Sequence, residues 1–321
     1  MNSQRGLLCA LLFTLLIGAP ASNAAGKVVH RERSLYQTLL VTEEPGRLCL
    51  KFSVRREQRN QSCMNPNRPQ EMLFPYTKMM LATLLIEPAP ERILVVGLGG
   101  GTLPLALSEL YPQAKLTVVE IDSAVVKVAR DYFAYRPGPR TEVIEQDARV
   151  FTKRQQRQID PLTEGYDLVL LDAFNGDYIP EHLLTREYLS ETRAIMKPGA
   201  VLAANTFAIS ALYDHESTTY TSVFGRILNL KLPETGNRVI IAQKSGGDDL
   251  LAANTLGEIE ETLLGRADTL DPRLAPYGIS LRQAVPRMLR APDWNPRARI
   301  LTDQYAPANI LNSRARSTSN P

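Results

Sequence analysis

The chain has 321 residues, 44% of them hydrophobic and 22% charged, and its 37 basic and 34 acidic residues leave a net charge of +3. This balance is typical of a globular protein and excludes a disordered or collagen-like chain. The basic residues are scattered along the chain instead of forming one long run, so we expect no nucleic-acid partner.

The first 24 residues have the order of a secretory signal peptide. Arg5 precedes the apolar run 6–19, and small residues follow up to Ala24 and Ala25. The apolar run is shorter than the roughly 20 residues that a membrane-spanning helix needs. We therefore predict cleavage after Ala24 and export, most simply to the periplasm, with no stable membrane span afterwards. The alternative is an uncleaved N-terminal anchor.

A small antiparallel β domain is expected over residues 25–70. Its β-rich runs are 36–42 and 47–54, with a turn signal at 44–46. Cys49 and Cys63 lie on either side of a polar stretch and could face each other across a hairpin. Two interpretations stay open for them: a disulfide, which would stabilise the fold by on the order of 3 kcal/mol, or two buried thiols.

From residue 71 to residue 300 the chain alternates between short apolar runs and helical patterns. The runs expected as strands are 93–96, 116–121, 141–144, 168–171 and 201–204, and the helices expected between them are 103–111, 123–133 and 187–196. This alternation is typical of an α/β fold, a doubly wound and mostly parallel sheet covered by helices on both faces. Helical patterns at 250–264 and 281–289 complete this domain, and 301–321 is expected to be a C-terminal tail.

Three successive strands of this domain end in residues suited to a nucleoside. The first runs into Gly97-Leu98-Gly99-Gly100-Gly101, where backbone can approach a ligand closely. The second ends in Glu120-Ile121-Asp122, about 20 residues later, where a carboxylate can accept hydrogen bonds from both ribose hydroxyls. The third ends at Asp147, which could accept from an adenine amine. Because ligands of such sheets lie at the carboxyl ends of the strands, these residues predict one site.

Each of these residues also has a simpler interpretation that the sequence leaves open. Gly99 and Gly100 could serve only as turn residues. Glu120 could be a charge that favours the N-terminus of the next helix, and Asp147 could be a plain helix cap. These alternatives stand beside the nucleoside site because a helical pattern begins shortly after each of the three strands.

A fourth strand delivers Asp172 to the same edge of the sheet. A carboxylate directly after a run of apolar residues is placed to accept a proton from an amine nucleophile, so we predict a general base. Asp177, Glu181 and His182 follow in a loop that could line a cationic substrate or be solvated. With three His in the chain and no paired Cys/His spacing, we expect no metal site.

These motifs together resemble the spermidine synthase (polyamine aminopropyltransferase) superfamily. The matching residues are Ser34-Leu35-Tyr36-Gln37, Asn60-Gln61-Ser62, the glycine loop, Glu120-Ile121-Asp122, Asp147-Ala148 and Asp172. The resemblance implies a seven-stranded, Rossmann-like sheet of the class I methyltransferase type, preceded by the small β domain. It also implies transfer of an aminopropyl group from decarboxylated S-adenosylmethionine to putrescine or a related amine, and a homo-oligomer formed through the small domain.

The resemblance assigns a role to each site residue. Those implied to bind the nucleoside donor are Gln37, Gly97, Gly99, Gly100, Glu120, Asp122, Asp147 and Ala148. Those implied to surround the amine are Gln61, Tyr76, Asp172, Asn175, Asp177 and Pro180, with Asp172 as the catalytic acceptor of the amine proton.

The chain departs from the family pattern where the donor tail and the amine would bind. Gly100 stands where the family has an Asp that holds the aminopropyl ammonium, and Asn175 replaces the second Asp of the family's Asp-x-x-Asp. Tyr76-Thr77-Lys78 replaces Tyr-His-Glu, which exchanges an acidic group for a cation. Without a carboxylate at residue 100, intact S-adenosylmethionine is no longer repelled. Methyl transfer from that donor, or an exported protein that binds a nucleoside or polyamine without catalysis, are therefore the alternatives.

Overall fold

The computed structural model describes residues 26–54, 57–174, 179–247, 249–253, 255–289 and 291–315. Two of the predicted amine-site residues, Asn175 and Asp177, lie outside these ranges, as does the predicted signal peptide. Within the described residues, no helix combines the length and the apolar character that a membrane crossing needs.

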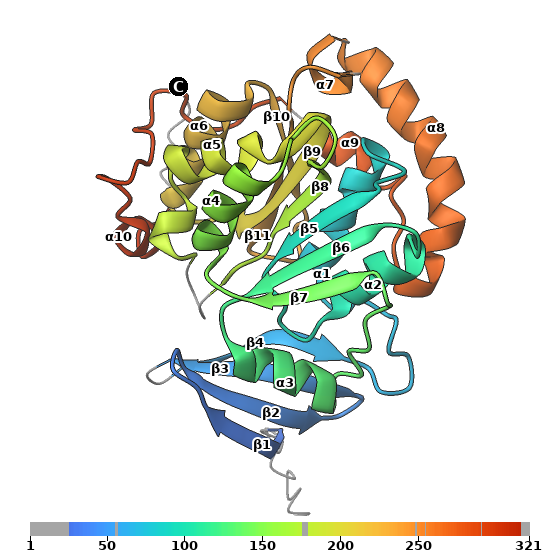
Figure 1. Ribbon diagram of the computed structural model, residues 1–321, viewed down its shortest axis with the longest axis vertical. Coiled ribbons are helices and arrows are strands. Elements are labelled where there is room, and N and C mark those ends of the chain that lie inside the picture. Colours follow the sequence, from blue (N-terminus) through green and yellow to red (C-terminus); the bar gives the residue numbers. More distant parts are fainter. Residues whose placement is uncertain are drawn as a thin grey trace, which may run out of the picture.

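The first part of the described chain is a four-stranded antiparallel sheet, drawn in blue in Figure 1. Its strands follow in chain order as β1 (Lys27–Arg33), β2 (Thr38–Glu44), β3 (Arg47–Val54) and β4 (Glu57–Met64). Apolar residues that alternate along β2 and β3, such as Leu39, Val41, Leu50 and Phe52, are buried in one core with residues of the larger domain. The small sheet therefore depends on the larger domain for its apolar cover.

A disulfide bond joins β3 to β4. Cys49 pairs directly with Cys63 in the antiparallel register, and the two sulfur atoms are bonded. Of the two interpretations left open by the sequence, the structure has the disulfide. The same register contains an irregularity: Leu50 pairs with Ser62 and Lys51 with Asn60, so Gln61 is an extra residue on β4. One extra residue on one strand of an antiparallel pair is a β-bulge.

The larger domain is built on a seven-stranded sheet in the order β10-β11-β9-β8-β5-β6-β7. Its strands are β5 (Arg92–Val96), β6 (Lys115–Glu120), β7 (Thr141–Glu145), β8 (Tyr166–Leu171), β9 (Met196–Phe207), β10 (Ile227–Lys231) and β11 (Asn237–Gln243). The first five are parallel, and β10 and β11 run antiparallel at one edge. The predicted Rossmann-like, doubly wound sheet with a small antiparallel β domain before it is confirmed.

Helices cover both faces of this sheet (Figure 1). The described helices are α1 (Pro75–Met80), η1 (Leu81–Leu85), α2 (Thr102–Leu110), α3 (Ser123–Tyr132), α4 (Ala148–Gln158), η2 (Glu181–Leu183), α5 (Arg186–Ala194), α6 (Leu212–Phe224), α7 (Leu250–Ala253), α8 (Leu256–Leu274), η3 (Ala275–Tyr277), α9 (Val285–Met288) and α10 (Ala308–Asn312). One buried apolar cluster contains residues of α2, α3, α8 and α9, and a second contains residues of α4, α5 and α6. The strands are apolar on both sides because both faces are buried.

Part of the segment expected to be a tail packs back onto the domain. Leu301 and Leu311 are buried in the second apolar cluster. Asp303 accepts hydrogen bonds from the Arg149 guanidinium at 2.7 Å and from the Thr185 hydroxyl at 2.7 Å. Apolar contacts and this ion pair hold residues 301–312 against α4 and α5, which the polar character of the segment did not reveal.

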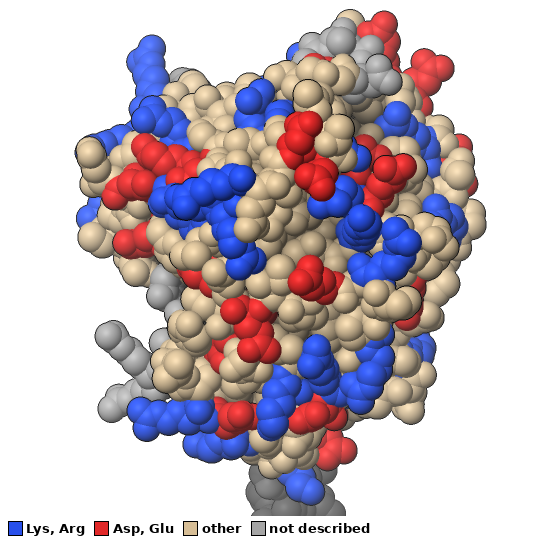
Figure 2. Space-filling model, in the orientation of Figure 1, with Lys and Arg blue, Asp and Glu red and all other residues tan. Residues whose placement is uncertain are grey.

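The surface carries charges of both signs. Figure 2 shows Lys and Arg side chains interleaved with Asp and Glu over the face drawn in Figure 1. Several charged side chains of the described residues are paired, for example Lys127 with Glu32 at 3.3 Å and Arg149 with Glu191 at 2.8 Å. This face therefore presents no continuous basic track of the kind that follows a nucleic-acid backbone.

Candidate functional site

A cavity of about 580 Å³ lies at the carboxyl ends of the parallel strands, next to the small sheet. Residues at the ends of β5, β6, β7 and β8 form one side of it, and residues of β4 and of the loop before β2 form another. This is the edge at which open α/β sheets bind their ligands. The cavity has the size of a site for a small organic molecule.

Glu120 is held at the end of β6 by backbone donors. Its Oε2 accepts from the amide of Leu98 at 2.9 Å, and its Oε1 accepts from the amide of Asp122 at 3.0 Å. Burial raises the pKa of Glu120 above its ordinary value, and these amides oppose that shift. The carboxylate lines the cavity beside Gly97 and Gly99, so the glycine loop and the second strand end meet as the sequence predicted.

Asp147 caps a helix and also lines the cavity. Its Oδ1 accepts from the amides of Arg149 and Val150, both at 2.9 Å, which caps α4. Its Oδ2 lies 2.9 Å from the Nε2 of His182, and this contact is the main cause of a lowered pKa of Asp147. Ala148 lines the cavity beside it. Asp147 thus caps α4 with one carboxylate oxygen while it lines the cavity, so its role as a helix cap does not exclude a role in ligand binding.

Asp122 is placed differently from its neighbour on β6. It is buried, accepts from the amide of Ala124 to cap α3, and accepts from the hydroxyl of Ser34 at 2.6 Å. It is absent from the residues that line the cavity, whereas Gln37, close to Ser34 in the chain, lines it. Asp122 therefore fastens the loop that carries Gln37 to the end of β6.

Gly100 also lies behind the cavity wall. It is buried, and a Cβ atom at this position would lie 2.5 Å from the Oγ of Ser62 and 3.1 Å from the Cδ1 of Phe133. The lining residues include Gly99 and Ser62 but exclude Gly100. Ser62, which comes from the small sheet, thus occupies the space that a side chain at residue 100 would need.

Asp172 lines the cavity at the end of β8. Its Oδ1 accepts from the Nδ2 of Asn205 at 2.9 Å. Burial raises the pKa of Asp172 to about 7, while hydrogen bonds from Asn205 and Tyr76 lower it and the Glu120 charge raises it slightly. A carboxyl group with this pKa exchanges a proton readily near neutral pH, which suits a general base.

A chain of amides behind Asp172 is the part of the site that sequence reasoning missed. Asn205 accepts at its Oδ1 from the Nδ2 of Asn237 at 3.0 Å, and Asn237 accepts from the hydroxyl of Thr235 at 3.0 Å. These bonds orient the Asn205 amide so that its NH₂ group faces Asp172. No local motif marks these residues, because they are brought together by the pairing of β9 with β11.

The remaining predicted amine-site residues are found on three elements. Gln61 on β4, Tyr76 on α1 and Pro180 before η2 all line the cavity, and the hydroxyl of Tyr76 donates to the backbone carbonyl of Gln61 at 3.4 Å. Lys78, the cation gained in the sequence, does not line it, and its Nζ lies beside Gly278. The cation gained in the sequence therefore adds no charge to the cavity wall.

Three amide oxygens in the cavity wall have no hydrogen-bond partner among the described residues. They are the Oε1 of Gln37, the Oδ1 of Asn60 and the Oε1 of Gln146, and each is buried. A buried acceptor without a donor is costly, so a ligand that binds here should bring donors. Ribose hydroxyls, an adenine amine and an ammonium group all provide them.

The described residues contain no group of His, Cys, Asp or Glu side chains that could hold a metal ion. The polar atoms of the cavity are carboxylates, amides, hydroxyls and the backbone of the glycine loop. Fold and cavity together define a class of protein: a Rossmann-like α/β protein with a ligand-sized cavity at the carboxyl ends of its strands, beside a carboxylate that can accept a proton.

Comparison with known proteins identifies the family within this class. The model of the spermine/spermidine synthase domain matches residues 73–228. A polyamine aminopropyltransferase of Vibrio vulnificus (strain CMCP6) is 44% identical over 308 residues, which are 95% of this chain and 97% of the relative. The chain therefore belongs to the spermine/spermidine synthase family and is a transferase.

Two further matches are more distant. The crystal structure of a probable spermidine synthase from Corynebacterium glutamicum has a TM-score of 0.59 at 20% identity, covering 74% of this chain and 87% of that one, and shows the shared fold. An N-terminal histidine N-methyltransferase of Emericella nidulans is 33% identical, but over 57% of this chain and 35% of its own length.

Proposed function

We propose that this protein transfers the aminopropyl group of decarboxylated S-adenosylmethionine to a polyamine-type amine, with Asp172 as the general base. The position of Asp172 carries the proposal: its carboxyl group, with a pKa of about 7, lies in the same cavity as Glu120 and Asp147. A base beside a nucleoside site is what direct transfer from a nucleoside donor to an amine requires.

Two polar parts of the donor, its ribose hydroxyls and its adenine amine, would meet acceptors in the cavity wall. Glu120, at the end of β6, would accept from the ribose hydroxyls, and the adenine amine would donate to Asp147 or to the buried amide oxygen of Gln146. The backbone of Gly97 and Gly99 leaves room for the chain that links ribose to sulfur.

The reaction would be a direct displacement. The neutral amine nitrogen attacks the methylene carbon next to the sulfonium, a carbon–nitrogen bond forms, and the carbon–sulfur bond breaks. The bonding electrons stay on sulfur, so methylthioadenosine leaves as a neutral thioether. The proton lost by the new ammonium passes to the carboxylate of Asp172. Asn205 and Tyr76 hold that carboxylate in place, so little reorganisation is needed when the proton arrives.

The experiment is a transfer assay with the chain that begins at Ala25. Decarboxylated S-adenosylmethionine and intact S-adenosylmethionine are each supplied with putrescine, and the products are separated by mass spectrometry. We expect an added aminopropyl group and released methylthioadenosine with the decarboxylated donor. A methylated amine formed only with the intact donor would contradict the proposal.

Methyl transfer from S-adenosylmethionine is the second candidate, and one observation favours it. Gly100 has no side chain, and the hydroxyl of Ser62 fills the space beside it, so no carboxylate from this position repels the carboxylate of the intact donor. Side-by-side binding of the two donors by calorimetry separates the candidates. A lower Kd for the intact donor would put methyl transfer first.

A third candidate is an exported protein that binds a nucleoside or a polyamine without catalysis. The predicted export favours it, because sulfonium donors are made in the cytoplasm and would have to be supplied outside. The buried disulfide between Cys49 and Cys63 supports the proposal of an oxidising compartment such as the periplasm. Export is tested by sequencing the N-terminus of protein recovered from the periplasm. We expect the chain to begin at Ala25, and a chain that begins at Met1 would contradict cleavage.

We also propose that the protein forms a homo-oligomer through its small sheet. β1 is the edge strand of this sheet, and its Val28 and Val29 are exposed apolar residues. An exposed edge strand presents unpaired backbone groups that another strand can pair with. Light scattering of the purified chain is expected to give a mass above 35.7 kDa, whereas the monomer mass would contradict the proposal.

A further inference from the structure

Three consecutive residues of β4, Asn60, Gln61 and Ser62, line the cavity. A regular strand does not achieve this, because its successive side chains point to opposite faces. The extra residue at Gln61 breaks the alternation, since Leu50 pairs with Ser62 and Lys51 with Asn60. The β-bulge thus turns a short stretch of the small sheet into one wall of the cavity.

A bulged hairpin needs something to fix its register. Moving the pairing of a strand by one residue sends each of its side chains to the other face, so a slip here would remove Asn60 and Ser62 from the cavity. The disulfide prevents the slip: Cys63 follows Ser62 directly and is bonded to Cys49 on the opposite strand. As long as the bond is intact, Ser62 must lie opposite Leu50.

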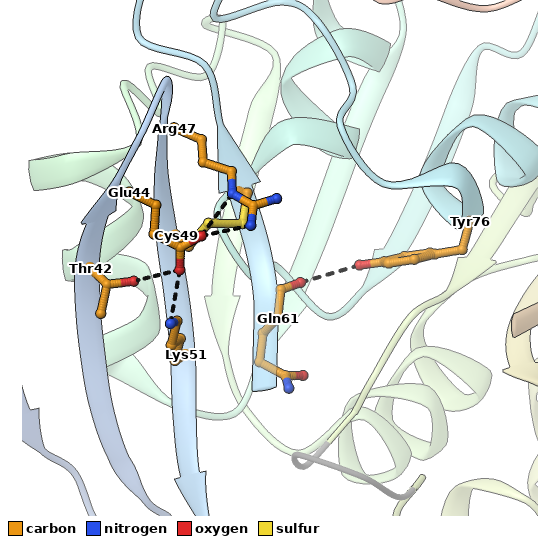
Figure 3. The surroundings of a disulfide bond; sticks show 8 residues. Thr42, Glu44, Arg47, Cys49, Lys51, Gln61 and Tyr76 are labelled. Atoms are coloured by element: carbon orange, nitrogen blue, oxygen red, sulfur yellow. Dashed lines mark hydrogen bonds and ion pairs between the residues drawn. A yellow bond between two sulfur atoms is a disulfide. The ribbon is translucent and has the colours of Figure 1, made fainter. Parts of the chain in front are cut away.

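The bulge also contacts the group that holds the base. Figure 3 shows the Tyr76 hydroxyl directed at the backbone carbonyl of Gln61, the bulged residue, at 3.4 Å. The same hydroxyl also faces Asp172, and its single proton, shared between the Gln61 carbonyl and this carboxylate, lowers the pKa of Asp172. A displacement of β4 would therefore reach Asp172 through one side chain.

We infer that the Cys49–Cys63 disulfide is a positioning element for the amine half of the site. It holds the bulge of β4 so that Asn60 and Gln61 face the amine and Tyr76 stays against Asp172. The donor half depends on it less, because Glu120 and Asp147 are held by backbone amides of the larger domain. This inference rests on the proposed function and specifies which part of the molecule sets the affinity for the amine.

The test compares the wild type with the double variant Cys49→Ala/Cys63→Ala. We expect the KM for putrescine to rise about fivefold or more, with kcat within about threefold and the Kd of methylthioadenosine within about twofold. A loss of stability alone would lower the active fraction and leave KM unchanged. An unchanged KM, or equal losses of amine and donor affinity, would overturn the inference.

Glu44→Gln is the matched control in the same sheet. Figure 3 shows Glu44 beside the disulfide, and its carboxylate pairs with Arg47 at 2.7 Å and with Lys51 at 2.9 Å. This substitution loosens the sheet but leaves the register and the disulfide intact. We expect its KM for putrescine to match the wild type. If Glu44→Gln raises KM as much as the cysteine double variant, general loosening explains both and the inference is wrong.

A second comparison needs no substitution. The chain from Ala25 is made in a reducing cytoplasm, its two thiols are counted, and oxidised glutathione is then added. The two thiols form one disulfide, and the glutathione disulfide is reduced to two glutathione molecules. We expect oxidation to lower the KM for putrescine about fivefold. The thiols are counted again after the addition, and identical kinetics with no free thiol left would contradict the inference even if the double variant does not fold.

Amine binding measured by calorimetry, with methylthioadenosine present, separates this inference from the proposed function. If the wild type binds putrescine but transfers no aminopropyl group, the proposed reaction is wrong. In that case the inference is tested by reducing the disulfide: a higher Kd for putrescine supports it, and an unchanged Kd contradicts it. If the wild type binds no amine at all, the inference is overturned together with the reaction.

Discussion

The two halves of the cavity are built in different ways. The proposed donor half consists of the ends of β5, β6 and β7, three neighbouring strands of one sheet, and its carboxylates are held by amides two or three residues away or in the glycine loop. The proposed amine half takes Asp172 from β8, Asn205 and Asn237 from β9 and β11, Tyr76 from α1 and Gln61 from the small sheet. Its geometry depends on contacts between residues far apart in the chain.

This difference suggests how such a fold changes its chemistry. Strand ends in a parallel sheet keep their spacing as long as the sheet forms, so the donor half is fixed by the fold itself. The amine half draws on residues of five separate elements, so a change in any one of them can alter its geometry while the sheet still forms. A variant in the donor half should therefore change donor affinity, whereas a variant in the amine half should change turnover or the acceptor.

The largest effect is expected from Asp172→Asn. Loss of the proton acceptor should lower kcat by about 10²- to 10³-fold, while the Kd of methylthioadenosine stays within about twofold. Steady-state kinetics and calorimetry measure the two. The control is Asp167→Asn at the start of the same strand, where Asp167 bonds Lys197 and the amide of Arg92 instead of lining the cavity. Unchanged turnover in Asp172→Asn would remove the proposed base.

Glu120→Gln should produce the next largest change, in the donor half. An amide cannot accept from two ribose hydroxyls as well as a carboxylate, so we expect the Kd of methylthioadenosine to rise about 10- to 50-fold. Calorimetry checks this against Glu142→Gln, an exposed residue of β7 away from the cavity. Equal donor affinity in both variants would mean that Glu120 has only a structural role.

Asp172→Asn should also stabilise the protein at high pH. The pKa of Asp172 is about 7 in the folded state and ordinarily 3.8, so the wild type loses stability as pH rises between these values. Above pH 7 the neutral variant should be more stable by about 1 to 2 kcal/mol, less than the full shift because the cavity is open to water. Thermal unfolding of both proteins at pH 4 and pH 8 measures the difference in stability. An equal difference at the two pH values would contradict the raised pKa of Asp172.

The smallest effect is expected from Asn237→Ala, which removes the bond that orients Asn205. The hydrogen bond that Asn205 donates to Asp172 lowers the pKa of that carboxyl. If Asn205 turns away once Asn237 no longer holds it, the pKa of Asp172 should rise. The base must be ionised to act, so kcat/KM of the variant should begin to fall at a higher pH than that of the wild type. At pH 7 we expect kcat/KM to be about threefold lower than in the wild type. A pH profile identical to the wild type would show that the amide chain does not reach Asp172.

The sequence predicted well which strand ends meet at the cavity, because these signals are local. Each strand end is a short apolar run followed by Gly97, Glu120 or Asp147, and parallel strands bring such ends to one edge whatever the rest of the chain does. Asp122 and Gly100 show the limit of this reasoning. Both belong to the same motifs, yet one faces Ser34 and the other faces Ser62, so neither lines the cavity.

The amine half could be predicted only in part. Asp172 follows a strand and was found, but Asn205 and Asn237 meet only because β11 pairs antiparallel with β9 in one particular register. The bulge at Gln61 is likewise a property of the pairing between β3 and β4, since no glycine or proline marks it in the chain. Register between distant strands is set by packing of the whole fold, which short-range patterns do not contain.

Gly97 places the two halves of the cavity under one mutational constraint. Its φ is +97°, and a Cβ atom here would lie 2.3 Å from the carbonyl oxygen of Asp172, at the end of the neighbouring strand. Any other residue would push the donor loop away from the strand end that carries the base. A neutral drift experiment should therefore tolerate many residues at Gly257, which has nothing within 4 Å, and none at Gly97. The glycine loop and the strand that carries the base can therefore change in sequence only while residue 97 remains glycine.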